Sequence, residues 1–309
     1  MAVPELGLLA RAKGVATHLL ARDVLESLAA ADDIEGFARS LSHQGADIEP
    51  VGEPVDVFAA HQDRRSLRAL LRGAAEGAPS VTRLQGLLPT PSLPRLALTD
   101  LAGQSSPADV VRKLVLLAHP DSGRLLGLVH GAHIDLLAVD VALLKGFAER
   151  AVRIATRGDD ALRQFVSMLI DVGNAQNALL MAREPAEARP QDLFVSGGRW
   201  VTAETFASAT AAESPQQALL ALTAALASSP VASVLPVVPT DVARLDRAFI
   251  ITTLERLKRA ARLEPLSTAP LLKVLLLIEA QSLDLRALAW GAAFGTPASV
   301  RQQQLVTPA

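Results

Sequence analysis

Apolar residues recur at helical spacing along most of this 309-residue chain. Three stretches show the pattern clearly, Leu144 to Ile154, Leu162 to Val172 and Ile250 to Ala261, each with apolar residues three or four positions apart. Half of the chain is apolar, yet aromatic residues make up only 3% and Tyr is absent. The core must therefore consist of Leu, Ala and Val, a mixture that favours helices over sheets. These features predict an all-α protein almost free of sheet.

Helix starts are marked by capping signatures, in which a side-chain oxygen precedes an acid or an amide by three residues. Such pairs occur at Asp23/Glu26, Asp32/Glu35, Ser106/Asp109 and Ser214/Gln217. The last two also carry proline at the first helical position, where a missing N–H is tolerated. The adjacent acids Asp32-Asp33 and Asp159-Asp160 are interpreted as helix N-termini as well, because carboxylates favour the positive end of a helix dipole.

The two proline-containing starts lie 108 residues apart (214 − 106), which indicates an internal repeat. Polar pairs at i, i+3 recur at a similar interval: Asp63/Ser66, Asn174/Asn177 and Gln281/Asp284. The second and third pairs each follow a long amphipathic segment that contains an acid, Asp140 or Asp246. We therefore predict three pseudo-symmetric helical units, 1–103 (abbreviated), 104–211 and 212–309, with boundary segments at 86–107 and 197–215. Chance recurrence in a chain rich in Leu and Ala is the alternative.

Composition narrows the classes of function. The chain has no Cys, so disulfides and thiolate metal sites are excluded, and its N-terminal residues predict no signal peptide. The formal charge of −2, with both signs interspersed, gives no basic footprint for nucleic acid or for a membrane surface. We expect a cytoplasmic protein whose partners are proteins.

The segment from Ser214 to Thr240 has no charged residue and is long enough to span a bilayer. Its polar residues and the prolines at 230, 236 and 239 predict instead a helix of about three turns, followed by an extended piece.

No constellation of catalytic residues emerges from the sequence. His130 and His133 could share a helix face near Asp135, but no third or fourth metal ligand follows at a recognisable spacing, so we expect no metal site. Gly197-Gly198 lacks the lysine and the preceding strand of a phosphate-binding loop. No Gly-x-Ser-x-Gly elbow is present. We expect no catalytic residue, no cofactor and no bound nucleotide.

The three polar pairs allow two interpretations, because polar groups among apolar neighbours must find partners or face a wet surface. They could line an interface with another protein. They could also cap or interrupt helices locally.

Several short segments follow one another in a recognisable order: Leu245-Asp246-Arg247, Glu279-Ala-Gln-Ser-Leu-Asp284-Leu285-Arg286 and Gly295-Thr-Pro-Ala-Ser-Val-Arg301. Upstream of them lie Arg22–Leu41, Asp63-Arg-Arg-Ser66-Leu67 with Arg72, and Asn174 and Asn177 with Arg183. In order and spacing these segments resemble the C subunit of the V-type and archaeal-type (V/A-type) rotary ATPases, whose eukaryotic relative is the d subunit. The resemblance covers nearly the whole chain. The departures are Gln281 for Glu, Asp284 and Ser66 for Asn, Asn174 for Asp, and the absence of Tyr.

The resemblance implies a funnel of three helical domains and a non-catalytic central-stalk subunit. Such a protein joins the rotor shaft to the membrane proteolipid ring, transmits torque for ion transport, and is peripheral to the membrane through that ring. The candidate shaft interface is then Asp63, Ser66, Asn174, Asn177, Gln281 and Asp284. Replacing Asp63, Asn177 and Asp284 together by Leu is expected to keep the fold and to weaken shaft binding.

Two other classes of function stay open on the sequence alone. One is a helical-repeat scaffold that binds a different protein. The other is a helical enzyme with an unmarked pocket.

Overall fold

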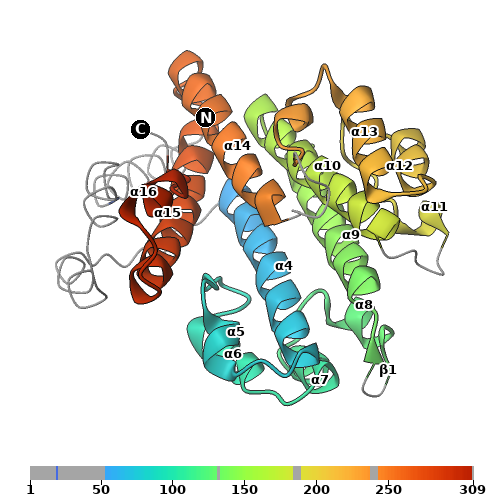
Figure 1. Cartoon of the computed structure of the whole chain (residues 1–309), viewed down its shortest axis with the longest axis vertical. Helices are drawn as coiled ribbons and strands as arrows, with labels where there is room; N and C mark the ends of the chain where they lie inside the picture. The colour runs from blue at the N-terminus through green and yellow to red at the C-terminus, as the bar shows by residue number, and fades with distance from the viewer. Residues whose placement is uncertain (1–18, 20–52, 131–132, 184–188, 237–242, 308–309) are drawn as a thin grey trace. The chain divides into compact units, whose positions relative to one another are not determined.

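Helices make up nearly all of the regular structure in the part of the chain that the computed structural model describes, residues 19, 53–130, 133–183, 189–236 and 243–307 (Figure 1). The strands within these ranges form a short antiparallel hairpin, β1 (Val129–His130) paired with β2 (His133–Ile134). The predicted all-α class is confirmed, and the funnel remains a prediction. The predicted caps at Asp23 and Asp32 lie outside the described residues.

Long helices alternate with shorter connecting ones. The long helices within the described ranges are α4 (Glu53–Ala75), α9 (Leu136–Ala155), α10 (Asp160–Arg183), α14 (Ala243–Leu263) and α15 (Ala269–Ala293). The short ones are α5 (Ser80–Leu84), α6 (Arg95–Ala102), α7 (Pro107–Leu116), α8 (Ser122–Leu126), α11 (Pro190–Leu193), α12 (Ala203–Thr210), α13 (Pro215–Leu226), the 3₁₀ turn η1 (Pro230–Ser233) and α16 (Ala298–Gln303).

The chain separates into two compact units. One runs from Val57 to Ala248, and the other takes Phe249 to Ala309 together with the chain up to Asp56. The three units expected from the sequence, 1–103, 104–211 and 212–309, stay a prediction.

In the larger unit, a continuous apolar core joins α4, α6, α7, α8 and α9. Leu67 and Leu71 of α4, Leu101 of α6 and Leu114 of α7 are all completely buried in it. Helix α10 packs along α9 on one side and against α12 and α13 on another (Figure 1). Gly173 marks a close approach, because a Cβ there would lie 2.7 Å from a methyl carbon of Leu144 on α9. These contacts bury most of the apolar residues predicted at helical spacing in the stretches Leu144 to Ile154 of α9 and Leu162 to Val172 of α10.

The predicted caps within the described residues are present. The hydroxyl of Ser106 accepts the Asp109 N–H at 3.2 Å, and that of Ser214 accepts the Gln217 N–H at 3.3 Å. Both helices begin with the expected proline. The carboxylate of Asp159 accepts the Leu162 N–H at 3.0 Å, so this acid marks the start of α10 as predicted.

Helix bounds recur at an interval of about 108 residues. The pair α6 and α12 shows it most clearly, because Arg95–Ala102 and Ala203–Thr210 have equal lengths and starts 108 residues apart (203 − 95). The starts of α7 and α13, and of α8 and η1, are also 108 apart. Helices α6 and α12 lie inside the segments that the sequence predicted only as boundaries. Burial of Leu98 and Leu101 in α6, and of Phe206 and Ala209 in α12, makes each a packed helix despite the surrounding Pro and Gly.

The uncharged stretch that begins at Ser214 forms α13, of 12 residues, followed by η1. The helix of about three turns predicted there is confirmed. Across the described ranges, no helix combines the length and hydrophobicity that crossing a membrane requires.

Candidate functional site

The six residues predicted as an interface lie on three long helices. Asp63 and Ser66 are on α4, Asn174 and Asn177 on α10, and Gln281 and Asp284 on α15. All six side chains are buried, with at most 7% of their surface exposed. Their interface role stays a prediction. The contacts below show what several of them do within the chain.

Asp63 holds the segment that follows α5. Its Oδ1 accepts the Thr90 hydroxyl at 2.5 Å, and its Oδ2 accepts the Ser92 hydroxyl. Thr90 Oγ1 in turn accepts the Leu93 N–H at 2.9 Å. The buried carboxylate therefore ties α4 to the residues just before α6, which satisfies polar groups that would otherwise be buried without partners.

Asp284 has a comparable role on α15. Its two carboxylate oxygens accept the backbone N–H groups of Val306 and Thr307, at 2.6 and 2.9 Å. Asp284 has no exposed surface, so these bonds fix the segment after α16 to the middle of α15.

The two asparagines of α10 differ in their contacts, although they lie one turn apart. Asn174 makes a two-way pair with the backbone of Val195, donating from Nδ2 to the carbonyl at 2.8 Å and accepting the N–H at 3.1 Å. The Nδ2 of Asn177 is buried and finds no acceptor among the described residues. Of this pair, Asn177 is the one whose amide nitrogen makes no hydrogen bond in that part of the chain.

Asp171 was missed by the sequence analysis. It has no exposed surface and accepts three consecutive backbone N–H groups, from Arg199 at 2.9 Å, Trp200 at 3.1 Å and Val201 at 2.8 Å. Burial raises the pKa of this carboxyl, while the three N–H groups oppose the rise. The signal that could have found it is the 108-residue interval itself, which leads from Asp63 to Asp171 and not to Asn174.

A buried ion pair was also missed. Arg150 on α9 donates from both terminal nitrogens to the two oxygens of Asp121, which is completely buried before α8. Burial acts to lower the pKa of Arg150, but its hydrogen bonds and proximity to Asp121 prevail and raise it. Next to this pair, His119 accepts the Asp121 N–H at 3.2 Å, and its Nε2 lies 3.7 Å from Asp63. The turn between α7 and α8 is thereby attached to α9, and its histidine lies beside Asp63 of α4.

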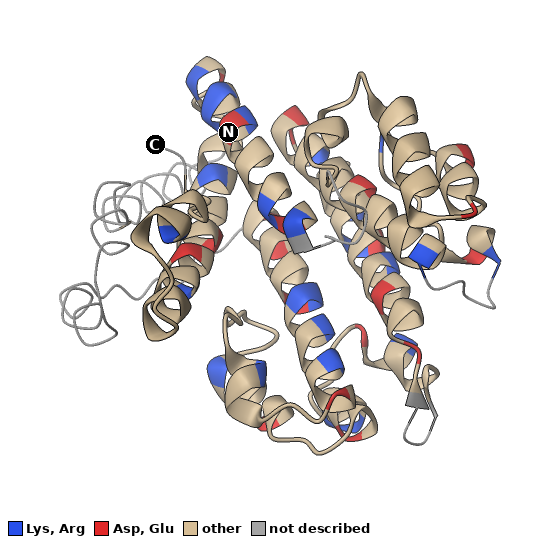
Figure 2. Cartoon of the chain, in the orientation of Figure 1, with Lys and Arg blue, Asp and Glu red and all other residues tan. Residues whose placement is uncertain are grey.

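Basic residues recur along α4 (Figure 2). Arg68 and Arg72 both reach Asp140 of α9, at 3.1 and 2.7 Å. Arg64 instead lies over the ring of Phe147, 5.8 Å from its centroid. Burial, with the neighbouring charge of Arg68, lowers the pKa of Arg64 to about 10, because both disfavour its charged form. These contacts join α4 to α9 by charge as well as by apolar packing.

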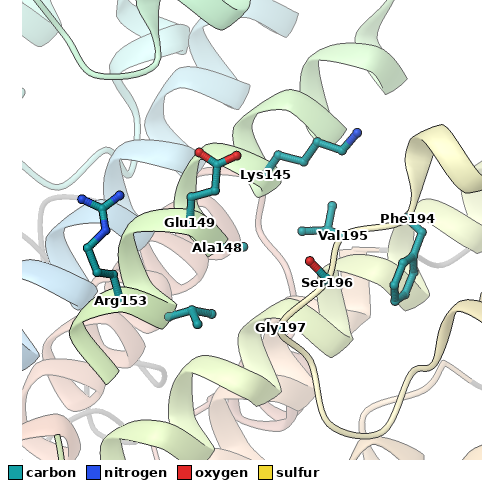
Figure 3. A pocket seen from close by; sticks show the side chains of 9 residues that line it. Lys145, Ala148, Glu149, Arg153, Phe194, Val195, Ser196 and Gly197 are labelled. Atoms are coloured by element: carbon teal, nitrogen blue, oxygen red, sulfur yellow. The ribbon is translucent and has the colours of Figure 1, made fainter. Parts of the chain in front are cut away.

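A cavity of about 580 Å³ lies between α9 and the segment after α11 (Figure 3). Lys145, Glu149 and Arg153 line it from α9, and Phe194 to Gly197 line it from the other side. Lys145 donates to the backbone carbonyl of Asp192 at 2.5 Å, and Glu149 is paired with Arg124, so two of the charges that line this cavity already have partners.

The histidine pair considered for a metal does not lie on a helix. The backbones of His130 and His133 are paired in the β1–β2 hairpin, and Asp135 caps α9 by accepting the N–H groups of Leu137 and Ala138. The helical i, i+3 interpretation was wrong, because the helix starts only after this cap. Within the described ranges, no group of three or more His, Asp or Glu residues is placed to hold a metal ion.

Comparison with known proteins agrees with the resemblance seen in the sequence. The model of the family described as ATP synthase (C/AC39) subunit matches residues 47–303, well over half of the chain. The C subunit of the V-type ATP synthase of Thermus thermophilus is 26% identical over 258 residues, covering 83% of this chain and 75% of the relative. The C subunit of the A-type ATP synthase of Haloferax volcanii is 30% identical over 182 residues, covering 55% of this chain and 50% of the relative. The chain therefore belongs to the ATP synthase (C/AC39) subunit family.

Proposed function

We propose that this protein is the non-catalytic central-stalk subunit of a V/A-type ATPase or ATP synthase. It links the rotor shaft to the membrane proteolipid ring and transmits torque between them. The observation that carries the proposal is the family match across residues 47–303, together with a relative named as the C subunit of a V-type ATP synthase.

The internal contacts of the larger unit support a mechanical role. A protein that transmits torque must resist bending, and here α4 and α9 are joined by Arg68, Arg72 and Asp140, while Arg150 joins α9 to Asp121. In these pairs the carboxylate is buried and the guanidinium partly exposed, and removing the cation would leave a buried charge unpaired, so the pairs restrict sliding between helices. Apolar packing alone is less specific about register.

The six candidate residues belong to this proposal as its shaft interface. Asn177 differs from the residues whose bonds are described above, because its amide nitrogen lacks an acceptor within the described part of the chain. Three of the others, Asp63, Asn174 and Asp284, act first on segments of their own chain.

The test is purification of the tagged full-length chain from a membrane extract of its own source. The expected result is co-purification of the shaft subunits and the proteolipid, in fixed ratio, with ATPase activity in the same fraction. A second arm removes the chain from the complex and measures coupling. ATP hydrolysis should survive while ion transport falls, since the shaft and ring are then no longer joined. Recovery of a complex that lacks proteolipid and shaft subunits, or full coupling without this chain, would overturn the proposal.

A further inference from the structure

The segment between α11 and α12 is bound to α10 through two side chains one turn apart. Asp171 accepts the N–H groups of Arg199, Trp200 and Val201, and Asn174 pairs with both backbone groups of Val195. Five hydrogen bonds thus connect one face of α10 to the residues that lead directly into Thr202, the N-cap of α12.

The same segment is fitted closely to the helices behind it. A Cβ on Gly198 would lie 2.2 Å from Asp171 Oδ1, and a Cβ on Gly197 would lie 2.9 Å from a methyl carbon of Val152 on α9. Gly197 also has φ +110°, a conformation that residues with a side chain rarely adopt. Both glycines therefore allow the backbone to come near enough for the Asp171 bonds to form.

The arrangement recurs one interval earlier in the chain. Asp63 lies 108 residues before Asp171 (171 − 63), and the residues it holds, Thr90 and Ser92, lie 108 before Gly198 and Trp200. Here the carboxylate accepts two hydroxyl groups where Asp171 accepts backbone N–H groups. The held segment leads directly into Pro94, the N-cap of α6. A buried acid at this point of the long helix therefore precedes both eight-residue helices.

We propose that Asp171, with Asn174, and Asp63 are positioning residues that fix the path of the chain into α12 and α6. In doing so they hold the orientation of the helices that follow. A carboxylate accepting several donors is a strong and directional restraint, and a buried donor that loses its acceptor is costly, so the path is held firmly. The part of the proposal that concerns torque rests on the proposed function, since rigid connections between successive helices are what a torque-bearing protein needs.

The local test uses the full-length chain and Trp200 as a probe. The chain contains two tryptophans, so Trp290→Phe leaves Trp200 as the only indole. In that background, Asp171→Asn removes a carboxylate oxygen and places an amide donor against backbone donors. We expect amide exchange at 199–201 to be at least tenfold faster and acrylamide quenching of Trp200 to increase. The control is Leu169→Ala, a buried position on the same helix that lowers stability without removing an anchor.

The outcomes separate anchoring from a general loss of stability. Faster exchange at 199–201 in Asp171→Asn, without the same change in Leu169→Ala, supports the proposal. Equal exchange in both variants, or exchange in Asp171→Asn within twofold of the parent, overturns it. Thr90→Val and Thr90→Ser test the first anchor in the same way and decide the matter if Asp171→Asn does not fold. The valine should speed exchange at Leu93, whose N–H is bonded to Thr90 Oγ1, and the serine should restore it.

The coupling test is made in the assembled ATPase. Asp171→Asn should lower the number of ions moved per ATP hydrolysed, whereas Leu169→Ala should not. Normal coupling in an Asp171→Asn complex whose segment is demonstrably loosened would overturn the mechanical part of the proposal. Failure of the parent chain to assemble with the complex would instead overturn the proposed function and would leave the exchange results, which concern the anchor alone, unaffected.

Discussion

The Asp121 carboxylate accepts hydrogen bonds from both terminal nitrogens of Arg150, each at 2.7 Å, although the two residues are 29 positions apart in the chain. Asp121 is completely buried, whereas 26% of the Arg150 side chain is exposed. The pair fastens the turn before α8 to the last third of α9. A buried carboxylate with two parallel N–H bonds is well stabilised, but only as long as the guanidinium is there.

Arg150→Met should destabilise the protein by about 3 kcal/mol, because it leaves the Asp121 charge buried without its cation. Urea unfolding at neutral pH measures the change. The matched control is Arg124→Met, which removes the exposed pair between Arg124 of α8 and Glu149 of α9. This change should cost no more than about 1 kcal/mol. Equal losses in the two variants would show that the buried pair contributes no more than a surface one.

Gly146→Ala tests the same site sterically. A Cβ at Gly146 would lie 2.0 Å from Asp121 Oδ1, so the carboxylate would have to leave its place beside Arg150. We expect a loss of about 2 kcal/mol even though alanine favours helix more than glycine does. Gly123→Ala is the control, because that glycine is also helical and has no atom within 4 Å of its added Cβ. Thermal unfolding of both variants should show the first shifted down and the second unchanged or raised.

His61 predicts a pH dependence of stability. Burial, followed by the charges of Arg64 and Arg65, lowers the pKa of its imidazole well below 6.5, so the folded protein keeps it neutral. Below pH about 6.5 the His61 imidazole becomes protonated in the unfolded chain but stays neutral in the folded chain. The free energy of unfolding therefore falls as the pH falls. The slope can reach about 1.4 kcal/mol per pH unit.

The measurement for His61 compares the parent with His61→Phe, which keeps a ring beside Phe147. Between pH 7.5 and pH 5.5 the urea midpoint of the parent should fall further than that of His61→Phe, whatever the difference between the two proteins at pH 7.5. Parallel profiles would contradict the assignment of this dependence to His61.

Features that depend on local spacing could be predicted from the sequence. The helical class, the caps at Ser106 and Ser214, the start of α10 at Asp159 and the family all follow from neighbours within one or two turns or from short ordered motifs. The carboxylate partners could not be found in this way. Asp171 bonds to residues 28 to 30 positions away and Arg150 to one 29 positions away, and no local pattern encodes such contacts.

The 108-residue interval relates more residues than the polar pairs alone. Matching polar pairs by appearance joined Asp63/Ser66 to Asn174/Asn177, whereas a strict interval of 108 joins Asp63 to Asp171 and Ser66 to Asn174. The helix bounds follow the strict interval, since α6 and α12 obey it at both ends. The interpretation of His130 and His133 as one helix face was wrong for a different reason. Spacing of three fits a helix face, but the cap at Asp135 places these residues before the helix.

Burial changes the expected effect of replacing Asp63, Asn177 and Asp284 together by Leu. On sequence alone the fold was expected to survive this triple change. Asp284→Leu, however, would leave the buried N–H groups of Val306 and Thr307 without their acceptor, and Asp63→Leu would remove the acceptor of the buried Thr90 hydroxyl. Each lost acceptor costs about 1–3 kcal/mol, so the triple variant should lose stability before any effect on partner binding can be measured.

A sharper test of the interface compares single variants on α10. Asn177→Leu removes an amide whose nitrogen has no acceptor among the described residues, so it should leave stability nearly unchanged or raise it. If the amide bonds the shaft, its loss should weaken shaft binding about fivefold, which corresponds to about 1 kcal/mol. The matched control is Asn174→Leu, which removes two hydrogen bonds to the backbone of Val195. This variant should lower the unfolding midpoint. Titration of the shaft subunits against both variants decides the matter: unchanged affinity in a stable Asn177→Leu protein places the shaft contact away from this face of α10.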